Sequence, residues 1–267
     1  MCCFSGNPTS IREVKQTNIF VRLIERRQFL AYGMNIEATE PVAMILPLPV
    51  SPGVTEDSVQ FVNLAHYREF FVDLDSGFPK VIVGPPASFG AVSRGSIALP
   101  KLEVHRVGHF EASFVPSLSD FARLDPRFRI ADSVWRALPQ YEDWGFAVFK
   151  LIDLGRGLFR KRRTIHPMAL WFPTRDADRL FFPTVHIHDG RVHPNAQFDH
   201  LLYHQSRPTV HGWRWETSVE PAARFVDLER ARGLVDAELR MHRLSITGVN
   251  KNEDVWLPVT SLSNIAQ

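Results

Sequence analysis

The stretch that decides the fold is TNIFVRLIERRQFLAYGMNIEATEPVAMILPLPV, residues 17–50. It holds three short runs rich in β-branched, aromatic and other apolar residues, 17–23, 28–36 and 41–50, separated by charged or turn-prone residues. Such runs are typical of β-strands, and their direct succession predicts an antiparallel meander. Proline lacks the N–H group that a strand ladder needs, so the prolines from Pro47 onward are expected to end the third strand.

The rest of the chain repeats this pattern. Apolar runs at 144–153, 166–173 and 178–188 predict further strands, and a terminal hairpin is expected over 238–259. Helical spacing is confined to short stretches such as 64–75, which Gly77 follows as a stop signal. A long loop is expected over 84–96. The sequence therefore predicts an α+β protein dominated by antiparallel sheets, either sandwich-like or two stacked sheet units, with a few short helices.

Length and charge narrow the classes of protein to consider. A chain of 267 residues can form a single β-rich domain, 1–267, with two lobes of about 1–116 and 117–267 as the alternative. Its 31 basic and 29 acidic residues leave a formal charge of +2, which predicts neither a nucleic acid nor a membrane as partner. The N-terminus lacks the pattern of a signal peptide, so a cytoplasmic protein is expected.

A histidine-rich segment is the strongest functional signal. FPTVHIHDGRVHPNAQFDHLLYHQ, residues 182–205, contains five histidines. His186 and His188 alternate with apolar residues, as on one face of a strand. Asp189-Gly190 is typical of a type I′ hairpin turn, which would place His193 opposite His186. The second pair, His200 and His204, fits a helix or a strand, and we favour the strand.

This register predicts a metal site. Directly opposed Cβ atoms lie about 5 Å apart, so His186, His188 and His193 could bind one ion. Three imidazoles and an open position are found in catalytic zinc sites, and imidazole also suits other divalent transition metals. Zinc is the expected cofactor, and the leading hypothesis is a metal-dependent hydrolase acting on a small-molecule or peptide substrate. The alternative is that these side chains form the solvated face of a sheet.

The two cysteines are adjacent, at the start MCCFS. Their spacing excludes a framework of structural disulfides. Removal of Met1 would leave Cys2 with its own α-amine beside the thiol, a group that can act as nucleophile and base together. In this respect the terminus resembles N-terminal-nucleophile cysteine hydrolases, which makes Cys2 a candidate catalytic residue of an amidohydrolase. Cys3 could be a thiol without a role or a further metal ligand.

A broader resemblance rests on the order of several segments. The cysteine segment is followed by TNIFVR, AMILPLPVSPG and the block GFAVFKL…HPMALWFPT…LFFPTVHI. This order resembles an uncharacterised bacterial family of unknown function, usually seen as secreted domains. The resemblance implies a β-rich architecture, and because the family has no known activity, it supplies no catalytic residues to carry over. A non-catalytic binding module is a third hypothesis for the function.

Overall fold

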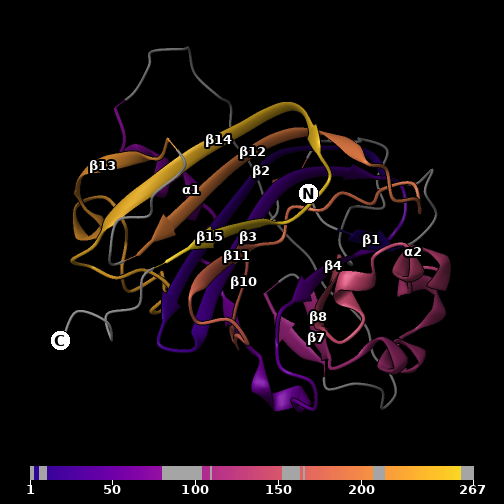
Figure 1. The fold of residues 1–267 in the computed structure, drawn as a ribbon. Helices are drawn as coiled ribbons and strands as arrows, with labels where there is room; N and C mark the ends of the chain where they lie inside the picture. Colours follow the sequence, from indigo (N-terminus) through magenta and orange to yellow (C-terminus); the bar gives the residue numbers. More distant parts are fainter. Residues whose placement is uncertain are drawn as a thin grey trace.

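The computed structural model describes residues 3–5, 11–79, 104–108, 110–151, 163–164, 166–206 and 214–259. It is 49% strand and 15% helix, with several mostly antiparallel sheets and few, short helices, so the predicted fold class is confirmed (Figure 1). The α-helices of these ranges are α1, Phe70–Ser76, and α2, Asp132–Arg136. Neither has the length and hydropathy of a membrane-spanning helix.

The larger of the sheets has eight strands and is called the large sheet. Its first strands form the hairpin predicted from the sequence, with Glu25 in the left-handed conformation at the turn. Within the described residues its neighbours pair antiparallel except for one parallel pair, β12 with β2. The strands, in spatial order, are β13 (Glu216–Pro221), β14 (Arg240–Lys251), β12 (Asn195–Gln205), β2 (Ile11–Ile24), β3 (Arg27–Ala38), β10 (Met168–Pro173) and β5 (Gln60–Asn63), with β9 (Arg163–Thr164) beside β3.

The third run of the opening stretch leaves this sheet. It forms β4, Val42–Leu48, which pairs with β1 and β8 in a second, five-stranded sheet, called the small sheet. The predicted meander is therefore wrong beyond its first two strands. The small sheet has the order β1 (Cys3–Ser5), β4, β8 (Gly145–Leu151), β7 (Phe110–Val115) and β6 (His105–Val107). Strands from both halves of the chain thus pair in both sheets.

Successive side chains of a strand point to opposite faces, and apolar side chains form a core on each face of the small sheet. In β4, Met44 and Leu46 face a central core between the two sheets, which also contains Leu30 and Tyr32 of β3. Ile45 faces the opposite way, into a core beneath a helical cover. Every residue of β4 is buried, because both faces of the strand are covered. Figure 1 shows α2 of this cover beyond β4 and β8, on the side away from β2 and β3.

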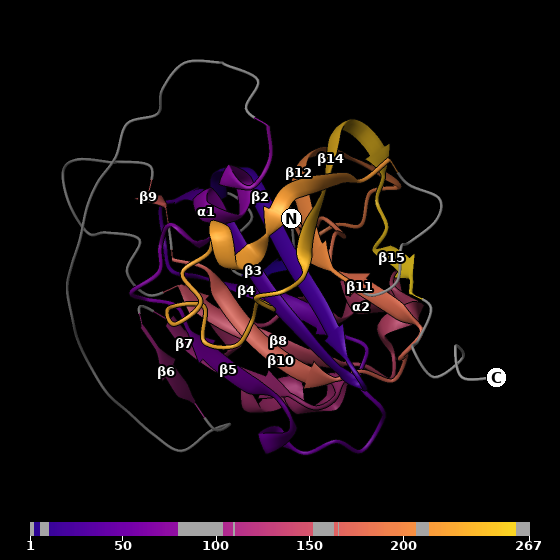
Figure 2. The same cartoon turned by 90° about the vertical axis from the view of Figure 1, so that its left-hand side faces the viewer.

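Short helical segments complete the layers. The helical cover consists of α2 and the 3₁₀ segments η3 (Leu118–Arg123), η4 (Pro126–Phe128) and η5 (Pro139–Tyr141). A third core lies on the outer face of the large sheet, under α1 (Figure 2) and the 3₁₀ segment η6, Ala222–Arg224. The helix predicted over 64–75 begins only at Phe70. A further 3₁₀ turn, η2, spans Glu56–Ser58.

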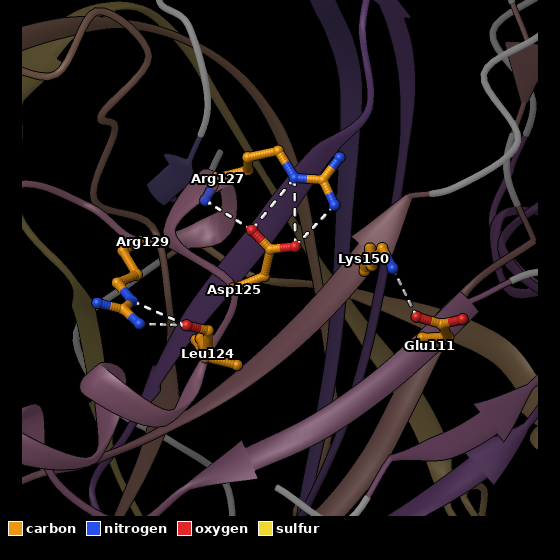
Figure 3. A network of polar contacts seen from close by, with 6 residues as sticks. All are labelled: Glu111, Leu124, Asp125, Arg127, Arg129 and Lys150. Carbon is orange, nitrogen blue, oxygen red and sulfur yellow. Dashed lines mark hydrogen bonds and ion pairs between the residues drawn. The ribbon is translucent and has the colours of Figure 1, made fainter. Parts of the chain in front are cut away.

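Figure 3 shows charged contacts within the small sheet and within the cover beside it. Lys150 of β8 donates to Glu111 of β7 at 2.8 Å, across a directly paired position. The same ammonium group lies 5.1 Å from the ring centroid of Phe128 in η4. Arg127, whose guanidinium carbon lies 5.4 Å from the centroid of the same ring, pairs with Asp125 at 2.7 Å. The Lys150–Phe128 cation–π contact thus adds to the apolar packing between the cover and its sheet.

The end of the chain differs from the predicted hairpin over 238–259. Strand β14 ends at Lys251, and β15, Val255–Pro258, pairs with β11, Arg179–Phe182, in a separate two-stranded sheet. The buried amide of Gln28 joins this pair to the large sheet. Its Nε2 donates to Phe181 O at 2.6 Å, and its Oε1 accepts from Phe181 N at 3.0 Å.

Candidate functional site

The histidine segment runs alongside the N-terminal strand instead of folding back on itself. Phe4 N donates to Ile187 O at 3.0 Å, and Cys3 and Ile187 form a parallel bridge. On its other side the segment is held by Asn252. The amide of this residue accepts from His186 N at 2.7 Å and donates to His186 O at 3.0 Å. The backbone of the segment is therefore paired on both sides by distant parts of the chain.

The predicted hairpin at Asp189-Gly190 is wrong. Gly190 has a positive φ of 74°, but Asp189 does not, whereas a type I′ turn needs both. The carboxylate of Asp189 instead accepts from Arg191 N at 3.0 Å, as in an Asx turn. The next strand, β12, begins at Asn195 and pairs with β14 and β2.

The structure brings together a different set of histidines from the predicted one. His186 stacks against His188 with ring centroids 5.5 Å apart, and against His200 of β12 at 5.1 Å. His193 lies apart on the surface, where its Nε2 is 2.8 Å from Asp189 Oδ2. A metal ion is bound through a nitrogen lone pair in the plane of an imidazole, but stacked rings present their faces to one another.

No group of three or more His, Cys, Asp or Glu side chains that could hold a metal ion is found in the described ranges. The prediction of a metal-dependent hydrolase is therefore wrong. Cys2, the candidate nucleophile, lies outside the described residues. Its neighbour Cys3 is a thiol buried in β1, at 1% exposure.

Burial sets the charge state of these imidazoles. It lowers the pKa of His188 to about 4 and that of His186 to about 2, and it lowers the pKa of His200 further. Repulsion between neighbouring imidazoles acts in the same direction on His186 and His200. All three rings are therefore neutral at neutral pH, and they act as packed aromatic side chains beside Phe4 and Phe198.

The second predicted pair is also buried. His204 lies in strand β12, as favoured from the sequence, and stacks on His242 of β14 with centroids 4.6 Å apart. The rings of His204 and Trp215 meet in a T-shaped arrangement with centroids 4.4 Å apart. Burial lowers the pKa of both histidines. His204 and His242 therefore also pack as neutral rings.

A surface hollow of about 410 Å³ lies in the described part of the chain. Sequence reasoning missed it, because its parts come from the β2–β3 turn, the start of β8, the 174–179 segment and β15, and no local motif links them. Its lining residues are Arg26, Trp144, Arg175, Asp176, Ala177, Asp178, Arg179 and Trp256.

Two tryptophans form the aromatic part of the hollow. Trp144 and Trp256 meet edge to face, with centroids 6.0 Å apart and rings at 87°. Phe181 contacts both rings, at 5.3 and 4.8 Å. The guanidinium group of Arg179 lies 4.5 Å from the Trp256 ring, a cation–π distance. Trp144, Trp256 and Phe181 thus form one packed aromatic cluster.

The three arginines of the hollow differ in their partners. Arg175 donates to both carboxylate oxygens of Asp143 at 2.9 Å and to Val50 O at 2.7 Å. Arg179 pairs with Asp176 at 2.6 Å. Arg26 donates to the backbone oxygen of Arg175 at 3.2 Å, and no carboxylate of the described ranges forms an ion pair with it. Arg26 therefore keeps unused donors toward the solvent.

Comparison with known proteins gives a likeness in structure and none in sequence. No family model matches the chain, and no curated protein matches it. The crystal structure of baculovirus P35 matches with a TM-score of 0.50 and 15% sequence identity, over 97% of this chain and 100% of that chain. At this identity the likeness shows a shared fold. The resemblances to a secreted bacterial family and to N-terminal-nucleophile hydrolases are therefore wrong.

Proposed function

We propose that this chain inhibits a protease of the caspase class by binding to it. The observation that carries the proposal is the likeness in fold to baculovirus P35 over nearly the whole of both chains, which suggests a protein of the caspase-inhibitor kind. One fold can serve many functions, so the shared fold alone does not establish inhibition, and inhibition is what we propose. A likeness that leaves almost no part of either chain unmatched supports it better than one confined to a common sheet motif.

The build of the molecule supports a binding role. A protease inhibitor binds tightly when it is rigid before binding, because little conformational freedom is then lost. Both faces of β4 are covered by packed cores, and a further core supports the outer face of the large sheet. Such a layered framework can present surface segments in a fixed geometry.

The test is a protease panel. Purified chain is incubated with several caspases, with a papain-type cysteine protease and with trypsin, and residual peptidase activity is followed at increasing molar ratios. The expected result is loss of activity of at least one caspase near an equimolar ratio, with the other two enzymes unaffected. Intact-mass measurement of the mixture then shows whether the chain is cut or covalently attached.

A folding-defective variant supplies the control. Leu46→Asp places a charge in the central core, where Leu46 is fully buried, and should abolish both the fold and the inhibition. Full activity of every caspase in molar excess of wild-type chain would remove the proposal. Equal loss of activity of papain and trypsin would replace it with inhibition that is not specific to the caspase class.

A further inference from the structure

The hollow lined by Arg26, Arg179 and Trp256 has the chemistry of a peptide-binding site. Its lining holds three arginines and two aspartates, and a third aspartate, Asp143, pairs with Arg175. Arg175 and Arg179 already hold carboxylates, whereas Arg26 has no acidic partner in the described ranges. A guanidinium group presents a planar fork of donors that matches a carboxylate. The guanidinium group of Arg26 is therefore the group of the hollow that can bind a further carboxylate.

A second polar group distinguishes a peptide from a simple anion. Asp178 lines the same hollow, and its backbone is fixed on both sides: its N donates to Asp176 Oδ1 at 3.0 Å and its O accepts from Val259 N at 2.8 Å. Its carboxylate repels a lone anion but can accept a hydrogen bond from an amide N–H. A ligand with a carboxylate and a nearby amide satisfies both Arg26 and Asp178.

The aromatic wall and the volume limit the size of such a ligand. Trp256 is only partly buried, and Arg179 lies over its ring, so this wall offers a mixed apolar and cationic surface to a ligand. A volume of about 410 Å³ lies at the lower end of the range for small-ligand sites. We propose that the hollow binds a short acidic peptide segment of a partner protein, with the segment's Asp or Glu carboxylate on Arg26 and a backbone N–H on Asp178.

Binding can be measured with the chain alone, so this inference does not depend on the proposed function. The probe is a blocked five-residue peptide of alanines with a central glutamate, titrated while tryptophan fluorescence is recorded, because two of the six tryptophans lie in the hollow. The matched peptide with a central glutamine, sodium acetate and inorganic phosphate are titrated in parallel. The glutamate peptide is expected to bind at least about tenfold more tightly than the other three, a difference that one charge-assisted contact can supply.

Three variants locate the site. Arg26→Gln should weaken binding of the glutamate peptide about tenfold, and Asp178→Asn should lower the ratio of peptide affinity to acetate affinity. Arg224→Gln is the control, because Arg224 is exposed on η6, whose Ala222 packs in the core outside the large sheet. It should bind as wild type does. Urea unfolding confirms that each variant is folded.

Several outcomes would overturn the inference. Equal binding of the glutamine peptide would show that no carboxylate is recognised, and equal binding of acetate or phosphate would show a simple anion site. Unchanged affinity in Arg26→Gln would place the ligand elsewhere. An equal loss in Arg224→Gln would show general attraction between charges instead of a site.

Discussion

At the scale of single residues, side-chain amides make the backbone hydrogen bonds that a neighbouring strand would otherwise make. A carboxamide carries both a donor and an acceptor, as a peptide group does. Gln28 pairs with both backbone groups of Phe181, and Gln205 pairs with those of Asp236 at 2.8 and 2.9 Å. Asn252 does the same for His186. Each amide joins segments more than 30 positions apart, which no local pattern in the sequence can indicate.

Replacing Asn252 tests this role. Asn252→Ala removes three hydrogen bonds. The Oδ1 of Asn252 accepts one from His186 N, and its Nδ2 donates the other two to His186 O and His193 O. At about 1 kcal/mol for each lost hydrogen bond, the free energy of unfolding should fall by about 2–3 kcal/mol. Urea unfolding followed by fluorescence measures it. Asn250→Ala is the matched control: its amide donates to Thr247 O and Gly248 O of its own strand, and because water can replace such local bonds near the surface, it should cost less.

The candidate site could be predicted only in part. The alternation in the sequence correctly puts His186 and His188 together, and β12 is the favoured strand that contains His200 and His204. The choice of His193 as their neighbour was wrong, because it assumed that an Asp-Gly pair always closes a hairpin. Phe4 and Asn252, far away in the sequence, compete successfully for the backbone of the segment.

At the scale of elements, β1 and β4 explain where the sequence reasoning failed. The run VAMILPL has no polar alternation, which is typical of a strand covered on both faces, and such a strand belongs between layers. The continuous apolar character of VAMILPL therefore indicates a strand of a second sheet, not the third strand of a meander. β1 has three residues and lies in a segment that sequence reasoning assigned to catalysis. Its strand character comes from β4 and Ile187 on either side.

Truncating the central side chain of β1 should show how much this short strand contributes. Phe4 is 4% exposed, belongs to the central core and meets His188 edge to face at 5.8 Å. Phe4→Ala is expected to lower the free energy of unfolding by about 3–5 kcal/mol, as for other large core truncations. Chemical denaturation measures the change. Val249→Ala, at a side chain 72% exposed, should change it by less than about 0.5 kcal/mol.

At the scale of the whole molecule, buried neutral histidines make stability depend on pH. The folded pKa values of His188 and His186, about 4 and about 2, lie below the ordinary value of 6.5 that applies when the chain unfolds. Below pH 6.5 the unfolded chain therefore binds protons that the folded chain does not. Asp254 opposes this trend, because burial raises the pKa of its carboxyl to about 6. The histidines, being more numerous, should dominate.

The free energy of unfolding should accordingly fall as the pH is lowered from 7 to 5. Each buried histidine contributes a slope of up to about 1.4 kcal/mol per pH unit below 6.5. Urea titrations at pH 7, 6 and 5 measure this. His188→Phe should have a smaller slope than wild type, whereas Val249→Ala, which removes no titratable group, should leave it unchanged. A stability that is constant over this range would contradict the burial of neutral imidazoles.

The parallel pairing of β12 with β2 also has a consequence for the nascent chain. Gln16 and Asp199, which are hydrogen-bonded beside this pair, are 183 positions apart. At a synthesis rate of about 5–20 residues per second, β2 leaves the ribosome roughly 10–40 s before its partner exists. Until then, the edge of β2 that β12 will cover is an open template for pairing with other chains. Productive folding in the cell should therefore depend on chaperone protection of the N-terminal half during translation.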